Sequence, residues 1–473
     1  YIRGLSHFIV AGRALRIYLG VATLVGTEIG LVTVVYNAQE GFERGFSAWT
    51  IGIIQMVSFI IIGTTGFIVS QLRERGVMTI PEFYEQRFDK RVRWLGGLVL
   101  ALSGILNMGL FLQAGGKFVT AVLGIEPGWG LKVVMTVMLL MVLFYTTLGG
   151  MVSVVLTDFV QFVVLSFGMV ITTFIIISKV GWSEVFDTVA TRYQLGGFNP
   201  IANPNYGWLW LAWQSFGNFA AATLWQPSTL RALSAHNPIV ARRIYFWASV
   251  AFLARVMMPA FWGMCALTLA MQLPEMHKAF FGNGAQTLTT DFAMPMLIAR
   301  ALPTGLLGNM TAGMLAAFMS THDSYLLCWS SVITQDVIAP LCRRGLSERA
   351  RMWLTRIGII LIGLFLLIWG LWYETPTTLW NYMLITGTIY LAGAFVVVVA
   401  GLHWKRASST GALLTILAGT TALFGLRNWE LTIIGKQFIL TQHHIGFITI
   451  VLCILAMVVG SLLFPDKPKI ARS

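Results

Sequence analysis

The sequence predicts an all-α polytopic membrane protein, because of its composition and the layout of its apolar runs. Of the 473 residues, 57% are hydrophobic and 11% are charged, whereas soluble domains carry about 25% charged residues. The mean hydropathy is +0.76. Many separate runs reach the roughly 20 apolar residues that a helix needs to cross a bilayer. We therefore expect a single transmembrane domain over 1–473, with no soluble domain attached.

Twelve spans are expected, joined mostly by short connections. They cover residues 14–36, 48–72, 94–123, 129–147, 151–178, 207–227, 244–272, 304–338, 353–372, 379–402, 408–426 and 445–464. The longest connections are 179–206 and 273–303. The apolar stretch 292–302 in the second connection predicts a short external helix.

The distribution of basic residues sets the orientation. With residue 1 on the cytoplasmic side, 22 of the 32 Lys and Arg residues lie in cytoplasmic segments and 8 in external ones. Lys117 and Arg255 lie inside spans. This bias is the one described by the positive-inside rule, so the net charge of +13 reflects topology and does not indicate a nucleic acid partner. Both ends are expected in the cytoplasm.

The eighth span carries an unusual concentration of polar residues. Helical spacing places Ala317, Ser320, Thr321 and Ser324 on one face. Hydroxyl and carbonyl oxygens are the ligands that a hard cation such as Na⁺ prefers. The alternative is a helix whose hydroxyls bond back to the carbonyls four residues earlier.

Acidic side chains inside spans are functional candidates, because a charge at bilayer depth needs a partner. Glu28 lies in the first span, between Gly26 and Gly30. Two glycines four apart indicate either close helix packing or an unwound segment facing a cavity. The sixth span has its own irregularity, at Gln214, Gly217, Asn218, Gln226 and Pro227. An interrupted first helix in each half is typical of transporters that bind solute near the midplane, between inverted repeats.

Asp158 is the acid of the fifth span. It is either a structural carboxylate bonded to a neighbouring helix or a partner for the oxygen-rich face of the eighth span. Two carboxylates, several hydroxyls and backbone carbonyls would suit Na⁺.

Five segments, in order along the chain, resemble motifs of the sodium:solute symporter family. They are FIVAGRALR (8–16), GVMTIPEFYEQRFDKRVRWLG (76–96), LGGMVSVVLTDFVQ (148–161), LRALSAHNPIVARR (230–243) and AAFMSTHDSYLLCWSSVITQD (316–336). Leu230 stands where many members have Gln. Family members begin with one further helix, so the resemblance implies thirteen spans in the natural protein.

The resemblance implies a LeuT-like inverted-repeat bundle with five plus five core helices and flanking helices. The repeats would be 14–178 and 207–402, followed by two accessory helices within 408–464. One sodium site would use the carbonyl of Ala317, the hydroxyls of Ser320 and Thr321, and carbonyls near Gly26 and Ile29. A second would use Asp158, Asp323 and Ser324 together with Ser320. Asp323 occupies a position where some two-sodium members have Ser.

The function expected from these features is sodium-coupled symport that imports a small polar organic solute by alternating access. Sodium is the expected ion, the solute is an amino acid, sugar or organic acid, and the location is a cell membrane of the bacterial inner-membrane type. The candidate solute-binding residues are Glu28, Thr33, Gln55, Asn107, Gln113, Trp213, Gln214, Asn218, Tyr382 and Thr386. Arg255 either binds a substrate carboxylate or neutralises an acid such as Glu28.

Three other classes of protein are alternatives to a sodium-coupled symporter. A proton-coupled carrier or an ion channel would use His322 beside Asp323 as a proton relay. A sensor would keep the transporter fold without turnover. An enzyme is not expected, because the sequence has no HExxH, GxSxG or paired His motif.

Overall fold

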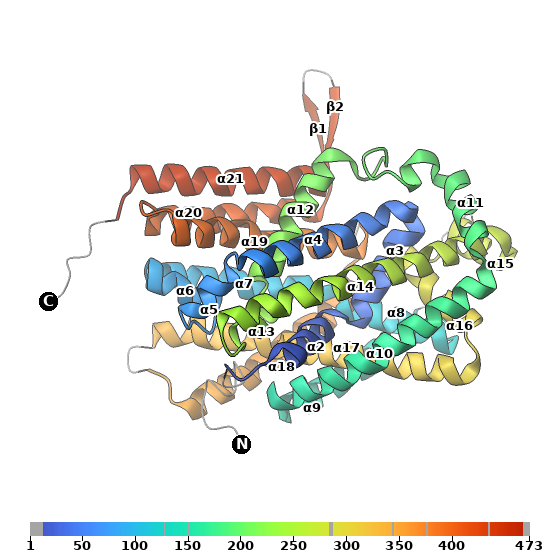
Figure 1. Ribbon diagram of the computed structural model, residues 1–473, viewed down its shortest axis with the longest axis horizontal. Coiled ribbons are helices and arrows are strands. Elements are labelled where there is room, and N and C mark those ends of the chain that lie inside the picture. Colours follow the sequence, from blue (N-terminus) through green and yellow to red (C-terminus); the bar gives the residue numbers. More distant parts are fainter. Residues whose placement is uncertain are drawn as a thin grey trace.

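A bundle of long helices, lying side by side along the longest axis of the molecule, forms the fold (Figure 1). The computed structural model describes residues 13–126, 128–148, 151–282, 287–342, 345–374, 377–433 and 436–466. The long helices are α2 (Ile17–Glu28), α3 (Leu31–Arg44), α4 (Trp49–Thr65), α7 (Lys90–Asn107), α8 (Phe111–Leu123), α9 (Trp129–Leu148), α10 (Met151–Val180), α12 (Gly207–Leu224), α14 (Pro238–Gln272), α17 (Thr304–Val332), α18 (Glu348–Trp372), α19 (Leu379–His403), α20 (Ser409–Gly419) and α21 (Gln442–Leu463).

Shorter elements connect these helices. They are α5 (Val69–Glu74), α6 (Ile80–Arg87), α11 (Trp182–Tyr193), α13 (Gln226–Leu233), α15 (Pro274–Phe281), α16 (Ala293–Ala301), the π-helical η6 (Ile333–Ile338), and the 3₁₀ segments η2 (Gly45–Ala48), η3 (Met108–Leu110), η4 (Gln194–Gly197), η5 (Thr290–Phe292), η7 (Ala339–Leu341) and η8 (Thr420–Leu426). The short helix expected within 292–302 is present as α16.

Every expected span coincides with helix in the structure. Within the described residues, eight helical stretches are long and apolar enough to cross a membrane, and α2 and part of α9 are shorter apolar helices. The polytopic membrane class is therefore confirmed. Several boundaries differ from the expectation. The first span consists of α2 and α3 and continues to Arg44, and the second span ends at Thr65 with a separate α5 behind it.

Two of the expected irregularities are real breaks in helices. Between α2 and α3, Gly30 is extended, with φ −101° and ψ 167°. Between α12 and α13, Trp225 is extended, with φ −69° and ψ 114°. Pro227 follows in the first turn of α13, where its missing N–H costs nothing. The unwound interpretation of the first span is thus correct, and each break frees backbone groups inside the bundle.

The expectation of an all-α fold is incomplete, because the described chain also contains a β-hairpin. Strands β1 (Trp429–Ile433) and β2 (Lys436–Leu440) pair antiparallel, with Trp429 opposite Leu440. The hairpin projects from the bundle between η8 and α21 (Figure 1). Each strand is only five residues long. The prediction of spans depends on apolar runs of about 20 residues, so it does not include such strands.

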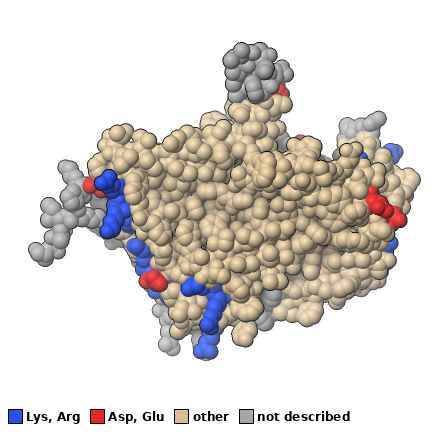
Figure 2. Space-filling view, turned by 45° about the horizontal axis from the view of Figure 1, so that its top comes forward, with Lys and Arg blue, Asp and Glu red and all other residues tan. Residues whose placement is uncertain are grey.

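Basic side chains gather toward the end of the molecule at which α21 finishes (Figure 2). This end also carries α6 and the α19–α20 turn (Figure 1). It is the cytoplasmic end of the predicted topology, as the positive-inside rule requires.

Candidate functional site

The break between α2 and α3 lies directly against the polar face of α17. A Cβ atom on Gly30 would lie less than 3.0 Å from the Thr321 hydroxyl oxygen, which real Cβ atoms essentially never do. Thr321 is 6% exposed, Ser320 4% and Ala317 0%. Glycine at position 30 therefore allows the unwound backbone to reach the hydroxyls of α17.

Carbonyl groups at this break supply further oxygens. The last turn of α2 leaves carbonyls without helical partners. Two carbonyls at the break do have partners. Val25 O accepts from Ile29 N at 2.8 Å, and Glu28 O accepts from the Thr33 hydroxyl and from Arg255 Nη1, both at 2.8 Å. The carbonyls of Gly26 and Ile29 take no part in these bonds.

The Thr321 hydroxyl also makes the bond expected from the alternative interpretation. It donates to Ala317 O at 2.8 Å. The hydroxyl proton is used in this bond, but the oxygen lone pairs point elsewhere. The bond therefore orients Thr321 without removing its capacity to bind a cation.

Helix α10 packs antiparallel to α17 and completes the surroundings of this face. A Cβ on Gly313 would lie near Leu165, and one on Gly168 near Met310. Extending this register by about two turns, at 1.5 Å per residue in both helices, places position 158 level with Ser320. The side chain of Asp158 lies outside the described residues.

Gln161, one turn along α10 from Asp158, is 5% exposed. Neither end of its amide has a hydrogen-bond partner among the described residues. The same register places position 161 level with Ala317.

Two further polar residues of α17 are buried at the same level. Asp323 is 6% exposed and Ser324 is 5% exposed. The Ser324 hydroxyl has no hydrogen-bond partner among the described residues. Burying a hydroxyl without a hydrogen-bond partner costs free energy. A ligand that binds the hydroxyl oxygen of Ser324 would therefore stabilise this arrangement.

His322 does not form a relay with the polar face. Its Nδ1 lies 2.9 Å from Phe318 O, and its ring packs 3.9 Å from the Phe318 ring and 5.8 Å from the Phe111 ring. The side chain is fully buried among aromatic rings. This environment does not favour proton transfer.

Glu28 and Arg255 form an ion pair on the other side of the break. Arg255 Nη1 lies 3.3 Å from the Glu28 carboxylate, and the two side chains are 6% and 15% exposed, respectively. The other carboxylate oxygen of Glu28 accepts from the Ser228 hydroxyl on α13. The two broken helices are thus joined through one carboxylate.

A chain of amides extends from this pair into α12. Arg255 Nε donates to Gln55 Oε1 at 3.2 Å, Gln55 donates to Asn218 Oδ1 at 3.0 Å, and Asn218 donates to Gln214 Oε1 at 3.1 Å. Of the ten candidate solute-binding residues, five therefore lie in one connected network with the ion pair: Glu28, Thr33, Gln55, Gln214 and Asn218.

Three more candidates form a separate cluster between α7 and α19. Asn107 donates to Thr386 Oγ1 at 3.0 Å, and the Tyr382 hydroxyl donates to Leu106 O at 2.6 Å. These bonds hold two helices together.

The remaining two candidates lie apart from the break. Trp213 donates to the Thr388 hydroxyl at 3.2 Å. Gln113 donates to Gly370 O and Tyr373 O at 2.8 and 2.7 Å, respectively. Both side chains act in bonds between helices.

Ser228 and an aromatic pair are parts of the site that the sequence interpretation missed. The rings of Tyr36 and Trp380 lie 5.0 Å apart, and both residues are buried. Tyr36 is two turns along α3 from the break. This position of Tyr36 near the break is the only feature of the sequence that could have indicated the aromatic pair.

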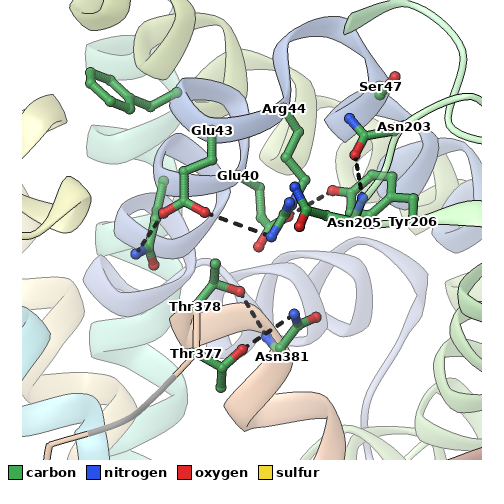
Figure 3. A network of polar contacts seen from close by, with 12 residues as sticks. Glu40, Glu43, Arg44, Ser47, Asn203, Asn205, Tyr206, Thr377, Thr378 and Asn381 are labelled. Atoms are coloured by element: carbon green, nitrogen blue, oxygen red, sulfur yellow. Dashed lines mark hydrogen bonds and ion pairs between the residues drawn. The ribbon is translucent and has the colours of Figure 1, made fainter. Parts of the chain in front are cut away.

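A polar vestibule lies at the outer end of α3 (Figure 3). It has a volume of about 550 Å³, and Glu43, Arg44 and Asn381 are among the residues that line it. The Glu40 carboxylate accepts from Arg44 at 2.8 Å and from the Tyr206 hydroxyl at 2.6 Å. Figure 3 shows these side chains turned toward one another above the Thr377–Asn381 turn.

A layer of hydrogen bonds lies between the vestibule and the break. In this layer Gln39 accepts from Leu379 N at 3.1 Å and donates to the Thr290 hydroxyl at 3.0 Å. The Tyr36–Trp380 pair lies beneath these bonds, nearer to the break along α3.

A second layer of polar contacts lies toward the end that is predicted to be cytoplasmic. Arg93 at the start of α7 pairs with Asp336 in η6 at 2.8 Å and with Glu85 at 2.6 Å. Gln226 at the start of α13 accepts from Ile80 N at 3.2 Å. The polar groups at the break thus lie between these two layers of polar contacts.

This arrangement defines a class of protein. Two broken helices, a face of α17 rich in hydroxyl oxygens, and a charged network between the two breaks are typical of a secondary transporter. Within the described residues no three His, Cys, Asp or Glu side chains could hold a metal ion together.

The chain belongs to the sodium:solute symporter family, whose profile matches residues 8–419. It is 23% identical to sodium/glucose cotransporter 4 of Danio rerio, over 98% of this chain and 74% of the relative. It is 25% identical to the sodium/sialic acid symporter SiaT of Proteus mirabilis, over 80% of this chain and 76% of the relative.

A solved structure of a Na⁺-coupled sialic acid symporter, in a substrate-bound outward-open state, has the same fold. It superposes with a TM-score of 0.76 over 98% of this chain and 93% of that one, at 21% identity. The LeuT-like fold is confirmed. The protein is a transporter and not an enzyme, as expected from its sequence.

Proposed function

We propose that this protein is a sodium-coupled symporter that imports a small polar organic solute by alternating access. The observation that carries the proposal is the contact between the α2–α3 break and the Thr321 face of α17. One broken segment borders both the oxygen-rich face and the Glu28–Arg255 network. Ion binding and solute binding therefore act on the same backbone.

The first sodium site would consist of five oxygens. They are the carbonyls of Ala317, Gly26 and Ile29 and the hydroxyls of Ser320 and Thr321. All five residues are buried, and the Thr321 hydroxyl approaches the break at Gly30. A cation there would hold α17 against the unwound segment.

Removing one hydroxyl from this site should weaken sodium binding. Ser320→Ala and Thr321→Ala are each expected to raise the sodium concentration for half-maximal uptake by about tenfold, since one bond to a charged group contributes roughly 1.5 kcal/mol. The measurement is solute uptake into proteoliposomes across a sodium series. Ser330→Ala is the matched control, because Ser330 is buried on the same helix but donates to Leu327 O. Unchanged sodium dependence in both variants would refute the site.

A second sodium site is proposed at Asp158, Asp323 and Ser324, with Ser320 shared. Its support is the register of α10 against α17, which places positions 158 and 320 at one level, and the burial of Asp323 and Ser324. A carboxylate would offset the charge of a second ion.

Asp158→Asn is expected to lower the sodium:solute ratio from two to one, because the amide no longer neutralises the second ion. The ratio can be measured from the membrane potential at which solute flux reverses at fixed gradients. Asp187→Asn, on the external helix α11, is the control. A ratio that is the same in wild type and Asp158→Asn would eliminate the second site.

The solute would bind beside the break, against Glu28, Thr33, Gln55, Asn218 and Gln214. Acid, base and amide groups there can bond to the hydroxyl, amino or carboxylate groups of a small polar molecule. The relatives named above carry glucose and sialic acid. The other candidates, Asn107, Gln113, Trp213, Tyr382 and Thr386, would shape the walls through bonds between helices.

The ion would drive accumulation through linkage. If sodium favours the state that binds solute, solute must tighten sodium binding by the same factor. A membrane potential contributes roughly 2.3 kcal/mol per charge per 100 mV, so one or two ions suffice to concentrate a solute. Uptake of labelled amino acids, sugars and carboxylates into proteoliposomes, with and without a sodium gradient, tests this directly. Uptake of every panel member that is indifferent to sodium would refute the proposal.

Residues 14–178 and 207–402 would be the two inverted repeats, with 408–464 supplying accessory helices. Each proposed repeat begins with a broken helix. Alternating access would then open the Gln39–Leu379 layer and the Arg93–Asp336 layer in turn, in the cell membrane that houses the protein.

A further inference from the structure

A second cavity, far from the broken helices, lies at the cytoplasmic edge of the molecule. It has a volume of about 770 Å³ and is lined from three directions. The α6–α7 junction contributes 87–89, the α19–α20 turn contributes 405–409, and the end of α21 contributes 461–466. These segments meet at the left end of the molecule in Figure 1.

The basic side chains of this cavity have no acidic partners within the part of the chain that the structure describes. Arg87 donates to the carbonyls of Gly401 and Trp404, at 2.9 and 3.2 Å. Carbonyls satisfy its donors but do not neutralise its charge. Lys405 and Arg406 are exposed. Among the residues that the structure describes, no ion pair includes Arg87, Lys405 or Arg406.

The acids of the cavity are already engaged at helix starts. Asp89 accepts from the backbone N–H groups of Arg91 and Val92, at 2.8 and 3.0 Å. Asp466 accepts from Ser409 N at 2.9 Å and from the Ser409 hydroxyl at 3.1 Å. Both carboxylates therefore stabilise helix N-termini, and the three cations remain available to an anion from outside the chain.

Exposed apolar side chains lie on the two helices beside the cavity. Leu462, which lines the cavity, is 55% exposed, and Leu463 and Phe464 at the end of α21 are 67% and 56% exposed. Leu414 and Leu417 on the neighbouring α20 are 41% and 49% exposed. A ligand in this cavity thus meets positive charge with exposed apolar side chains nearby.

We propose that this cavity binds the phosphate headgroup of an anionic membrane lipid from the cytoplasmic leaflet. The phosphate would lie among Arg87, Lys405 and Arg406, and the acyl chains would lie along the exposed leucines of α20 and α21. A free phosphate would pair with the basic side chains but would not contact the exposed apolar side chains of α20 and α21. The geometry therefore favours the lipid. Because Arg87 also ties α6 to the end of α19, a bound lipid would stabilise the junction between the core and the accessory helices.

The test uses the purified full-length chain in a neutral detergent. Short-chain phosphatidylglycerol, short-chain phosphatidylcholine and inorganic phosphate are titrated separately, and the melting temperature and the bound lipid mass in native mass spectrometry are recorded. Phosphatidylglycerol should raise the melting temperature and remain bound. The double variant Lys405→Gln/Arg406→Gln should bind it about 30-fold more weakly, the factor expected for two basic residues near an anionic surface.

The control is Arg243→Gln, which removes an exposed cytoplasmic arginine at the start of α14, outside the cavity. Its affinity for phosphatidylglycerol should equal that of the wild type. Equal effects of phosphatidylcholine and phosphatidylglycerol would overturn the proposal, as would an equal loss in Arg243→Gln or unchanged binding in the double variant. A response to inorganic phosphate that matches the response to the lipid would show a phosphate site and refute the lipid assignment.

Discussion

Gly30→Ala is expected to remove most sodium-dependent uptake while leaving the protein folded. The added methyl group would meet the Thr321 hydroxyl at less than 3.0 Å, so the unwound segment must move away from α17. Overpacking of this kind costs about 1–3 kcal/mol, which corresponds to a roughly 5- to 150-fold weaker apparent affinity for sodium. Uptake across a sodium series measures the change.

Two variants separate this effect from a general loss of stability. Gly308→Ala adds the same methyl group to α17 where nothing lies within 4 Å, and its sodium dependence should match that of the wild type. Gly30→Ala/Thr321→Ala removes the clashing oxygen. It should recover thermal stability but keep a weakened response to sodium, because one ligand is missing. Normal sodium affinity in Gly30→Ala alone would show that the break and α17 do not bind the ion together.

Glu28→Gln and Arg255→Gln are each expected to abolish uptake and to lower thermal stability. Either change leaves its partner as an uncompensated charge inside the bundle. Breaking a buried pair costs about 3–5 kcal/mol, and the 15% exposure of the Glu28 side chain places the cost near the lower value. Melting temperature and uptake should be measured on the same preparations.

The double variant Glu28→Gln/Arg255→Gln distinguishes a structural pair from a solute-binding pair. Two neutral amides should restore much of the melting temperature, because no buried charge is left alone. Uptake should stay absent, because the solute has lost its charged contacts. Recovery of both properties would make the pair purely structural. Glu275→Gln, which breaks the exposed Glu275–Arg300 pair, should change neither property, since exposed pairs contribute about 0–1 kcal/mol.

The part of the candidate site that could be predicted from the sequence depends mostly on helical periodicity and on the positions of glycines. The spacing of Ser320 and Thr321 assigns them to one helix face in any helical fold, and the structure keeps both buried there. Gly26 and Gly30 left two interpretations of the first span open. Only the packing against Thr321 shows that the glycine serves an unwound segment.

Other parts could not be predicted because their partners are remote in sequence. Gln113 looked like a wall residue but donates to carbonyls of α18, more than 250 positions away. Ser228 carried no signal, although it joins the two broken helices through Glu28. The hairpin β1–β2 was not predicted, because its strands are short and lie between the expected spans.

The sequence by itself determined the membrane class, the order of the spans and the polar face of α17, and it predicts the orientation of the spans. These properties depend on local hydropathy, on the sign of loop charges and on a fixed helical period, all of which can be read along the chain. The tertiary structure decided which polar groups share a network and which carbonyls are released at the breaks. Such properties depend on the packing of helices distant in sequence, because a buried polar group is stabilised only by the partner that the fold brings to it.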